Sequence, residues 1–276
     1  MAKTYLITGT SSGFGRLMTE RLLARGDRVV ATVRDAGALA DLARAHGDRL
    51  RVELLDLTDT AAIRSVLARA FDAMGRIDAV VSNAGYGLFG AAEELDDAEI
   101  DRQIATNLTG SIQLIRAALP HLRAQGGGRI VQLSSEGGQI AYPGFGLYHA
   151  TKWGIEGFVE AVAQEVAPFG IDFLLVEPGP TATDFKAGLA HATPMAAYDG
   201  TPVAHIRRAL EDGGFGTLAD AGRSVHAMVA AMDADAPPLR LALGGNAYRS
   251  IIKALSGRLA AIEAQREVAL SADPDA

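Results

Sequence analysis

Residues 4–15 read T-Y-L-I-T-G-T-S-S-G-F-G, a short apolar run that passes directly into a glycine-rich turn. Apolar residues at helical spacing follow over 14–25, so the pattern predicts a strand, a turn and a helix. Gly9, Gly13 and Gly15 permit positive φ and let the backbone come close to a ligand. The helix that begins there would offer free N–H groups and the positive end of its dipole to a phosphate. The stretch therefore predicts a phosphate-binding turn after the first strand.

The remaining apolar runs have strand length and alternate with segments of helical period. We expect the further strands at residues 27–33, 50–56, 77–85, 128–135, 171–179 and 239–245. Near-continuous apolar strands separated by helices are typical of a parallel sheet that helices cover on both faces. The sequence therefore predicts an α/β fold with a doubly wound, mainly parallel sheet of the Rossmann type. Gly26 is expected to end the first helix, and Asp35 to begin a helix that runs through His46.

No strong linker interrupts the chain, so residues 1–245 are expected to form a single Rossmann-type domain. The segment at about 184–216, rich in glycine, proline and alanine, follows the sixth expected strand. Such a segment in a compact domain is usually a lid or a disordered loop, and we expect a lid. Residues 246–276 are expected to form a C-terminal helical tail.

Composition excludes several classes of function. The 276 residues carry a formal net charge of −7, which argues against a nucleic-acid surface because such surfaces are basic. The absence of cysteine excludes disulfides and thiolate catalysis, and the six histidines show no metal-ligand spacing, so no metal is expected. The apolar pattern predicts neither a signal peptide nor a membrane span. A cytoplasmic protein is the default expectation.

Three motifs occur in a fixed order along the chain: T-G-x-x-x-G-x-G at 8–15, S-N-A-G at 82–85 and Y-x-x-x-K at 148–152. This set resembles the short-chain dehydrogenase/reductase family, in its compact single-domain branch, over residues 4 to about 184. The resemblance implies a doubly wound sheet that binds NAD or NADP. It implies cofactor contacts from Gly9, Ser11, Ser12, Gly13, Phe14, Gly15, Arg34, Asp56, Leu57, Asn83, Ala84, Gly85, Asn107, Tyr148, Lys152, Pro178, Gly179, Thr181 and Thr183.

The end of the second strand predicts which dinucleotide is bound. Val33 stands where NAD-using relatives tend to carry an aspartate, and Arg34 follows it. A guanidinium can pair in a bidentate manner with the 2′-phosphate of NADP. Arg34 could instead be a solvated charge and Asp35 only a helix cap. We expect NADP(H), with NAD(H) the less favoured cofactor.

Tyr148 and Lys152 are four residues apart and would share one face of a helix. An ammonium beside a phenol stabilises the phenolate and lowers the phenol's pKa, as would the positive ring of an oxidised nicotinamide. The pair therefore suits a general acid and base that protonates an alkoxide as hydride reaches a carbonyl carbon. Ser135 is the expected second donor, with Ser134 as the alternative, because only one of two strand neighbours can face the cleft. Asn107 matches the family asparagine that kinks a helix and holds a water that passes protons from Lys152.

The substrate is expected to be a small carbonyl or alcohol compound that is fairly apolar and bulky. The residues that suggest an apolar pocket are Tyr86, Tyr142, Phe145, Phe185, Leu189, Met195 and Tyr198. His149 is expected to be solvated or packed rather than catalytic. Homodimers or homotetramers through the helices that carry Asn107 and Tyr148 are implied by the resemblance.

Three other functions remain open on the sequence alone. A ketoreductase acting on carrier-bound or CoA-bound acyl chains would need a basic patch, for which Arg207 and Arg208 are weak evidence. A non-catalytic NADP(H) sensor would often lose the tyrosine or the lysine, and both are present. A sugar-nucleotide epimerase usually adds a larger C-terminal domain.

Overall fold

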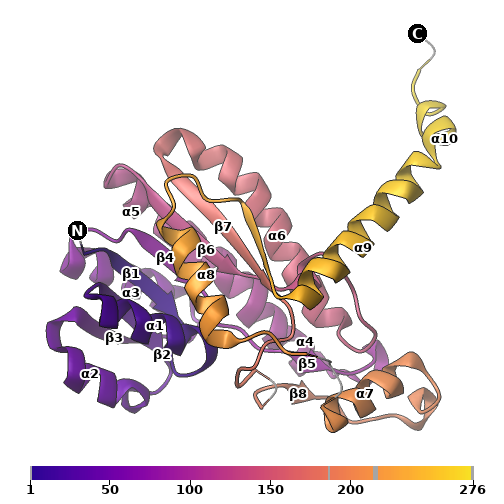
Figure 1. Ribbon diagram of the computed structural model, residues 1–276, viewed down its shortest axis with the longest axis horizontal. Helices are drawn as coiled ribbons and strands as arrows, with labels where there is room; N and C mark the ends of the chain where they lie inside the picture. The colour runs from indigo at the N-terminus through magenta and orange to yellow at the C-terminus, as the bar shows by residue number, and fades with distance from the viewer. Residues whose placement is uncertain (1, 186, 214–216, 275–276) are drawn as a thin grey trace.

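A computed structural model describes residues 2–185, 187–213 and 217–274. Seven parallel strands form the central sheet in the order β3-β2-β1-β4-β6-β7-β9 (Figure 1). Their bounds are Thr4–Thr8 for β1, Arg28–Val33 for β2, Leu50–Leu54 for β3, Ala79–Ser82 for β4, Gly128–Leu133 for β6, Ile171–Pro178 for β7 and Arg240–Leu243 for β9. The expected doubly wound parallel sheet is confirmed.

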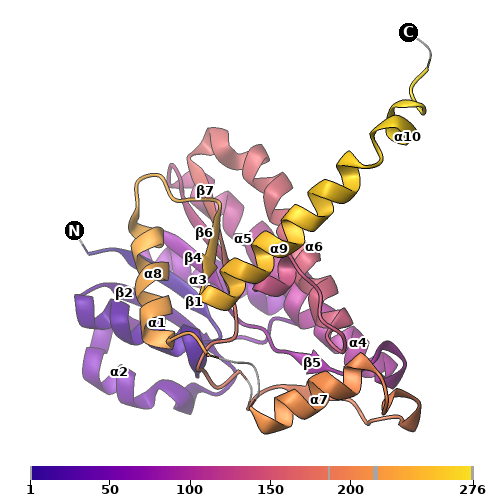
Figure 2. The same cartoon turned by 45° about the vertical axis from the view of Figure 1, so that its right-hand side comes forward.

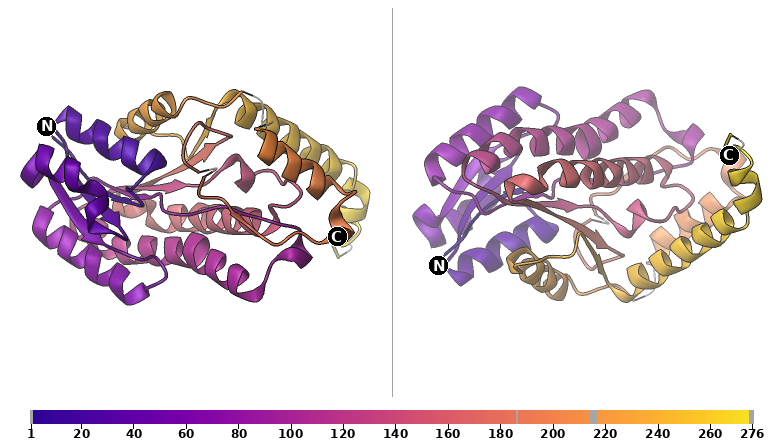
Figure 3. Two further views of the ribbon diagram at one scale, coloured as in Figure 1. Left: turned by 90° about the horizontal axis from the view of Figure 1, so that it is seen from below. Right: turned by 90° about the horizontal axis from the view of Figure 1, so that it is seen from above.

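Helices cover both faces of this sheet (Figure 3). On one face lie α3 (Thr60–Met74), α5 (Gly110–Ala124) and α6 (Gly146–Val166), and on the other α1 (Gly13–Arg25), α2 (Ala40–His46) and α8 (Ala221–Asp233). Each face has its own apolar core, with Leu67, Leu114 and Ile155 in one and Met18 and Met228 in the other. All five side chains, which lie on the helices, are fully buried. Because helices cover both faces of the sheet, the strand residues are buried on both sides, which explains why the strands read as continuous apolar runs.

The direction in which the strand order grows reverses between β1 and β4, because β2 and β3 extend the sheet to one side and β4, β6, β7 and β9 to the other. In open parallel sheets such a reversal leaves a crevice at the carboxyl ends of the strands, where ligands bind. The sequence motifs follow β1, β4 and β6, so the topology gathers them at this edge.

The structure differs from the expected helix after the second strand. The Asp35 side chain does cap the chain, since it accepts a hydrogen bond of 2.9 Å from the N–H of Gly37. The capped segment is a 3₁₀ turn over Ala36–Leu39, and α2 begins only at Ala40. Gly26 ends α1 in the left-handed conformation, with φ of 96°, as predicted.

The expected lid contains more regular structure than its composition suggests. A two-residue strand, β8 (Ala190–His191), pairs in parallel with β5 (Leu88–Phe89), outside the main sheet. A helix, α7 (Pro202–Asp212), follows it, and residue 186 and residues 214–216 lie outside the described part of the chain. Glu94 anchors the segment, because its carboxylate accepts from the N–H of Met195 (2.9 Å) and from the guanidinium of Arg207 (2.6 Å).

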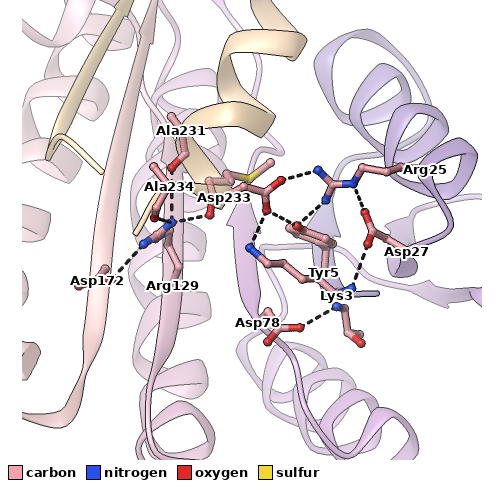
Figure 4. Close-up of polar contacts among 12 residues, drawn as sticks. Lys3, Tyr5, Arg25, Asp27, Asp78, Arg129, Asp172, Ala231, Asp233 and Ala234 are labelled. Atoms are coloured by element: carbon pink, nitrogen blue, oxygen red, sulfur yellow. Dashed lines mark hydrogen bonds and ion pairs between the residues drawn. The ribbon is translucent and has the colours of Figure 1, made fainter. Parts of the chain in front are cut away.

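A cluster of ion pairs lies at the opposite, amino-terminal edge of the sheet (Figure 4). Asp233 at the end of α8 accepts from Lys3 (2.9 Å), from the hydroxyl of Tyr5 (2.7 Å) and from Arg25. The shallow depression here is lined by groups that already bind one another, Asp27 with Arg25 among them. The cluster therefore ties β1 to α1 and α8, and the predicted chemistry lies at the other edge.

The chain leaves the body of the protein through α9 (Gly245–Glu263) and the short helix α10 (Arg266–Leu270). Figures 1 and 2 show α9 starting beside the end of β9 and then projecting away from the sheet and its helices. Among the described residues, no helix is both long and apolar enough to cross a membrane.

Candidate active site

The glycine-rich turn between β1 and α1 requires glycine for steric reasons. Gly9 and Gly13 have φ of 68° and 55°, which side chains rarely adopt. A Cβ on Gly15 would lie 2.2 Å from the carbonyl oxygen of Gly9. Beside Gly13, by contrast, no described atom lies within 4 Å of the corresponding Cβ position. The turn is thus tightly packed at Gly15 and open beside Gly13.

The open side of this turn fits the phosphates of a dinucleotide. The first N–H of α1 to bond back to the turn is that of Arg16, which donates to the oxygen of Ser12 (3.1 Å), so the N–H groups before it have no acceptor within the helix. Within the described part of the chain the Ser12 side chain makes no capping bond. Ser11 and Ser12 are exposed and Phe14 is half-buried beside them. Free donors at a helix N-terminus suit a pyrophosphate.

The turn after β4 fixes the shape of the glycine-rich turn. The Asn83 amide donates to the carbonyl oxygens of Thr8 (2.8 Å) and Gly9 (3.0 Å). The Thr8 hydroxyl accepts in return from the N–H groups of Asn83 (2.9 Å) and Ala84 (3.1 Å). A Cβ on Gly9 would lie 2.8 Å from the Cα of Ala84. Asn83 and Ala84 thus fix the conformation of the glycine-rich turn. Gly85, the next residue, is exposed.

Arg34 lies at the carboxyl end of β2 and is exposed, whereas Val33 before it is buried. Asp56 follows β3 close by. Hydrogen bonds from the N–H and hydroxyl of Thr58 lower the pKa of Asp56, and the charge of Arg34 lowers it further. No ion pair with Arg34 is found in residues 2–185, 187–213 and 217–274. The guanidinium is therefore available to an anion, while Leu57 beside Asp56 is buried.

Ser135 sits in a loop that α6 holds in place. Its Oγ accepts a hydrogen bond of 3.0 Å from the N–H of Gly137, which leaves the hydroxyl hydrogen free to be donated. The ring of His149 fixes this loop from α6, because Nδ1 lies 2.8 Å from the carbonyl oxygen of Gly137 and Nε2 accepts from the N–H of Tyr142 (2.9 Å). These partners require a neutral ring with its proton on Nδ1. His149 is packed, as expected, and it also positions the serine loop.

Tyr148 and Lys152 share one face of α6 next to this loop. The Lys152 Nζ lies 5.6 Å from the centre of the Tyr148 ring and donates to the carbonyl oxygen of Leu133 (2.9 Å), at the end of β6. Burial lowers the pKa of Lys152 to about 8, although the charge of Glu156 opposes the shift. Ser135 is half-buried beside the phenol, whereas Ser134 is buried and donates to Glu156.

The pKa of Tyr148 differs from the sequence-based expectation. Burial raises it to about 12, Ser135 lowers it in part, and the nearby carboxyl of Glu136 raises it further. The neighbouring ammonium does not outweigh burial, so the protein's own groups keep the phenol protonated at neutral pH.

Glu136 directly follows Ser135 and is buried. Its Oε1 accepts from the hydroxyl of Tyr142 (3.0 Å), and its Oε2 has no hydrogen-bond partner among the described residues. Burial raises the pKa of this carboxyl, and the bond from Tyr142 opposes the rise. Because Tyr142 binds Glu136, it borders the serine loop rather than standing free as a pocket wall.

Asn107 occupies a π-helical turn over Ile104–Thr109, between α4 (Asp97–Gln103) and α5. Its side chain is buried, donates to the carbonyl oxygen of Tyr86 (2.8 Å) and to the hydroxyl of Thr151 (3.4 Å), and accepts from the N–H of Tyr86 (3.1 Å). Thr151 is next to Lys152 in α6. Asn107 therefore links the turn after β4 to the helix that carries Tyr148, and π-turns of this kind are frequent at functional sites.

A network of charged side chains, in which Glu156 and Glu177 are buried, lies beside the site. Arg240 of β9 pairs with Glu156 of α6 (2.6 Å), with Glu160 (2.8 Å) and with Glu177 of β7. Glu156 accepts in turn from Ser134, and Glu177 from Gln139 of the serine loop (3.2 Å). Burial raises the pKa of Glu156, and Ser134 and Arg240 lower it. The network joins the neighbours of Ser135 and Lys152 to β7 and β9, the last two strands at one edge of the sheet.

The residues expected to hold the nicotinamide end follow β7. The N–H of Gly179 donates to the carbonyl oxygen of Leu243 (3.0 Å), and a Cβ on Gly179 would lie 3.0 Å from the backbone nitrogen of Ala247. Thr181 donates to the oxygen of Gly179 (2.8 Å), and the Thr183 hydroxyl accepts from the N–H of Phe185 (3.3 Å). Pro178, Thr181 and Thr183 are all half-buried at the same edge as Tyr148.

Two aromatic rings enclose Tyr148. The Phe145 and Phe185 rings lie 6.2 Å and 6.0 Å from it, centre to centre. Leu189 is buried against the cluster of Phe89, Val203 and Leu210, so it supports the lid. Met195 and Tyr198 lie further out, where the Tyr198 hydroxyl donates to Glu93 (2.7 Å). Of the residues expected to form an apolar wall, the structure places Phe145 and Phe185 beside the Tyr148 ring.

Sequence reasoning did not identify His149 as a positioning residue or the network around Arg240. The sequence could have indicated one residue of this network, because Glu156 is four residues after Lys152 and therefore lies on the same helix face. Its partners Arg240 and Glu177 are remote in sequence and gave no signal.

Comparisons with known proteins agree with this geometry. The family model for short chain dehydrogenases matches residues 3–193. Oxidoreductase BOA17 of Botryotinia fuckeliana is 35% identical over 98% of this chain and 99% of its own length. The crystal structure of a short-chain dehydrogenase from Streptomyces avermitilis is 38% identical, with a TM-score of 0.92 over 99% of this chain and 98% of that one.

More distant relatives bear on cofactor and substrate. Human retinol dehydrogenase 8 is 35% identical over 72% of this chain and 65% of its own length. A serine dehydrogenase in complex with NADP+ is 26% identical with a TM-score of 0.75, over 87% of this chain and 94% of that one. The 3-ketoacyl-(acyl-carrier-protein) reductase of Brucella melitensis in complex with NADH is 25% identical with a TM-score of 0.75, over 89% and 98% of the two chains. Nicotinamide dinucleotides of both kinds thus occur among similar structures.

Proposed function

The chain belongs to the short-chain dehydrogenase family, and we propose that it is an NADP(H)-dependent oxidoreductase that interconverts a ketone or aldehyde with the corresponding alcohol. One observation carries the proposal. Tyr148, Lys152 and Ser135 converge at the carboxyl edge of the sheet, where the glycine-rich turn offers donors to a dinucleotide. Cofactor and reacting group would therefore share one crevice.

Tyr148 is the proposed general acid and base. A bound nicotinamide would supply or accept the hydride. In reduction, the Tyr148 hydroxyl gives its proton to the carbonyl oxygen as that oxygen gains charge. Its pKa of about 12 in the protein alone keeps it protonated for this step. In oxidation the phenolate must form, so a positive charge beside the ring is needed to lower that pKa.

Ser135 and Lys152 complete the proposed chemistry. The Ser135 hydroxyl donates to the same substrate oxygen, because its own oxygen already accepts from Gly137. Lys152 would donate to ribose hydroxyls of the cofactor and, with a pKa of about 8, can exchange a proton near neutral pH. Asn107 is proposed to hold the water through which this proton reaches solvent.

The proposed preference for NADP(H) depends on Arg34. The side chain is exposed at the end of β2, next to a buried valine instead of an acid that would repel a phosphate. A bidentate guanidinium–phosphate pair is a strong and specific contact. We propose Arg34 as the group that binds the 2′-phosphate, with Asp56 and Leu57 beside the adenine.

A fairly bulky and apolar substrate is proposed. Phe145 and Phe185 face the Tyr148 ring, and a relative is named as a retinol dehydrogenase. The alternative of a carrier-bound acyl chain has less support, because Arg207 is bound to Glu94, which leaves Arg208 as the exposed member of the pair. A non-catalytic sensor would bind NADPH without turnover. A homodimer or homotetramer through α4, α5 and α6, in the cytoplasm, remains part of the proposal.

The test is an NADPH-oxidation screen over aldehydes, ketones and keto-acyl thioesters, repeated with NADH. Turnover of apolar ketones or aldehydes with NADPH supports the proposal. Turnover of thioesters alone would favour the ketoreductase alternative. Tight NADPH binding with no turnover of any class would favour the sensor.

A further inference from the structure

The projecting helix α9 carries a row of exposed apolar side chains. Tyr248, Ile252, Leu255, Leu259 and Ile262 are 64%, 51%, 43%, 60% and 69% exposed. Large apolar side chains arranged in one row on the surface of a protein mark an interaction site more often than scattered ones do. We call these five residues the α9 stripe.

The spacing of the α9 stripe is that of a helix–helix seam. Successive members are four, three, four and three residues apart, which is the apolar repeat of two helices that pack along their length. The stripe is narrow, because Arg249 and Glu263 flank it on one side and Arg258 on the other. A narrow stripe is typical of pairing with one other helix, since a helix that covers a globular core shows a wider apolar face.

The base of α9 is fixed to the body of the protein. Ala247 and Ile251 are buried, and the side chain of Arg258 lies over the ring of Trp153 in α6, 4.9 Å from its centre. The helix therefore leaves the body at a set angle (Figure 2). The exposed fractions of the five members show that the stripe is open to solvent.

We propose that the α9 stripe pairs in an antiparallel manner with the α9 stripe of a second copy of this chain. Charge favours this occupant and this direction. On one side of the stripe, Arg249 lies near the start of α9 and Glu263 lies at its end. Antiparallel pairing places Arg249 of each helix beside Glu263 of the other, whereas parallel pairing keeps these two residues about 21 Å apart along the helices, because fourteen residues rise that far. A two-fold axis through such a pair closes the assembly as a dimer.

The contact between Arg249 and Glu263 selects the register. When Leu255 lies against Leu259 of the second copy, Ile252 lies against Ile262 of the second copy, which gives four apolar layers with Tyr248 beyond them. Arg249 then approaches Glu263 of the second copy. This interface is separate from α4, α5 and α6, so it can exist with or without the assembly proposed for those helices.

A membrane surface is the competing occupant. Helices that lie on membranes have a broad apolar face and basic residues over the polar face. The basic residues here fit that description, but the stripe is narrow and an acidic residue flanks it. The second copy is therefore the occupant that the pattern favours.

The absence of cysteine permits a direct test by cross-linking. Two full-length variants, I252C and I262C, are purified separately and oxidised alone and as an equal mixture. In the proposed register, residue 252 of one copy meets residue 262 of the other, within reach of a disulfide. Two copies of I252C would place their cysteines about 15 Å apart along the helix, because ten residues rise that far. The same holds for I262C.

The expected result is a covalent dimer in the mixture and none, or very little, in either variant alone. Cross-linking of each variant with itself would show parallel pairing and overturn the proposal. No cross-link in any sample would overturn it as well. In the latter case, co-sedimentation of the wild-type protein with anionic vesicles would identify the membrane as the occupant.

A second measurement separates this interface from the others. L255E/L259E places like charges on the exposed stripe and leaves the buried base unchanged. We expect sedimentation to give half the wild-type mass for this variant, while NADPH binding persists. A control variant, K253E on the polar face, should keep the wild-type mass. An unchanged mass for L255E/L259E contradicts the proposal, whatever the result of the activity screen.

Discussion

The ammonium nitrogen of Lys152 lies 5.6 Å from the centre of the Tyr148 ring and donates to the carbonyl oxygen of Leu133. The lysine is buried, so folding favours its neutral form and its pKa falls to about 8. A charged lysine is better solvated in water, and we propose that this one is kept buried for its part in proton transfer. Stability and activity should therefore respond in opposite directions when it is replaced.

Lys152→Met is predicted to stabilise the fold at pH 7 and to abolish turnover. The folded pKa lies below the unfolded value of 10.5, so burying the charged form costs free energy at pH values below about 8. The shift corresponds to up to about 3 kcal/mol, reduced by the lost bond to Leu133. Thermal unfolding of both proteins measures it. The difference should shrink as the pH rises from 8 to 10.5, and a less stable variant at pH 7 would contradict the account.

Arg34→Ala is predicted to weaken NADPH binding by roughly 10- to 100-fold, the value of a charge-assisted hydrogen bond, and NADH binding much less. The reason is that only NADPH carries the 2′-phosphate. Fluorescence titration of both cofactors measures the two dissociation constants. Arg208→Ala, another exposed arginine, is the matched control. Equal losses for the two cofactors would remove Arg34 from the proposed phosphate site.

His149→Ala is predicted to lower kcat with little change in KM, because the loop that positions Ser135 loses its contact with α6. His149→Gln, which keeps a donor and an acceptor, should recover part of the loss. Burial lowers the pKa of His149 below its usual 6.5. Since the unfolded chain binds the proton first, wild-type stability should fall as the pH drops below 6.5. That fall should be smaller in both variants, while His205→Gln, at an exposed position, should behave as wild type.

Arg240→Met is predicted to destabilise the protein by about 3–5 kcal/mol, because Glu156 and Glu177 would be left buried without a cation. Chemical unfolding measures the loss. The triple variant with Glu156→Gln and Glu177→Gln removes those charges and should recover much of the stability. A triple variant no more stable than Arg240→Met would mean that the pairing of these charges is not what Arg240 contributes.

The sequence was a good guide to the fold because its signals are local. Short apolar runs, separated by segments of helical period, predicted all seven strands of the main sheet, and Gly26 predicted the end of α1. The lid was harder to foresee. Its composition suggested irregular chain, yet Glu94, about a hundred residues earlier, holds Met195 in place. The composition of the lid cannot indicate a partner that is so remote in the sequence.

The candidate site shows the same limit. Spacing along α6 predicted that Tyr148 and Lys152 lie together, and the family resemblance, through the distance to Tyr148, favoured Ser135 over Ser134. The raised pKa of Tyr148 was not foreseen, because it follows from burial and from Glu136, which only the folded structure reveals. Arg240 is 84 residues from Glu156, so no local pattern could connect them.

The central claim is that the Tyr148 hydroxyl transfers the proton. Single-turnover reduction of an active ketone by Tyr148→Phe, with NADPH binding measured on the same sample, tests it most directly. The account predicts an unchanged dissociation constant for NADPH and a hydride-transfer rate about 10²- to 10⁴-fold lower, the usual contribution of a general acid. A variant that binds NADPH normally and transfers hydride at the wild-type rate would contradict it.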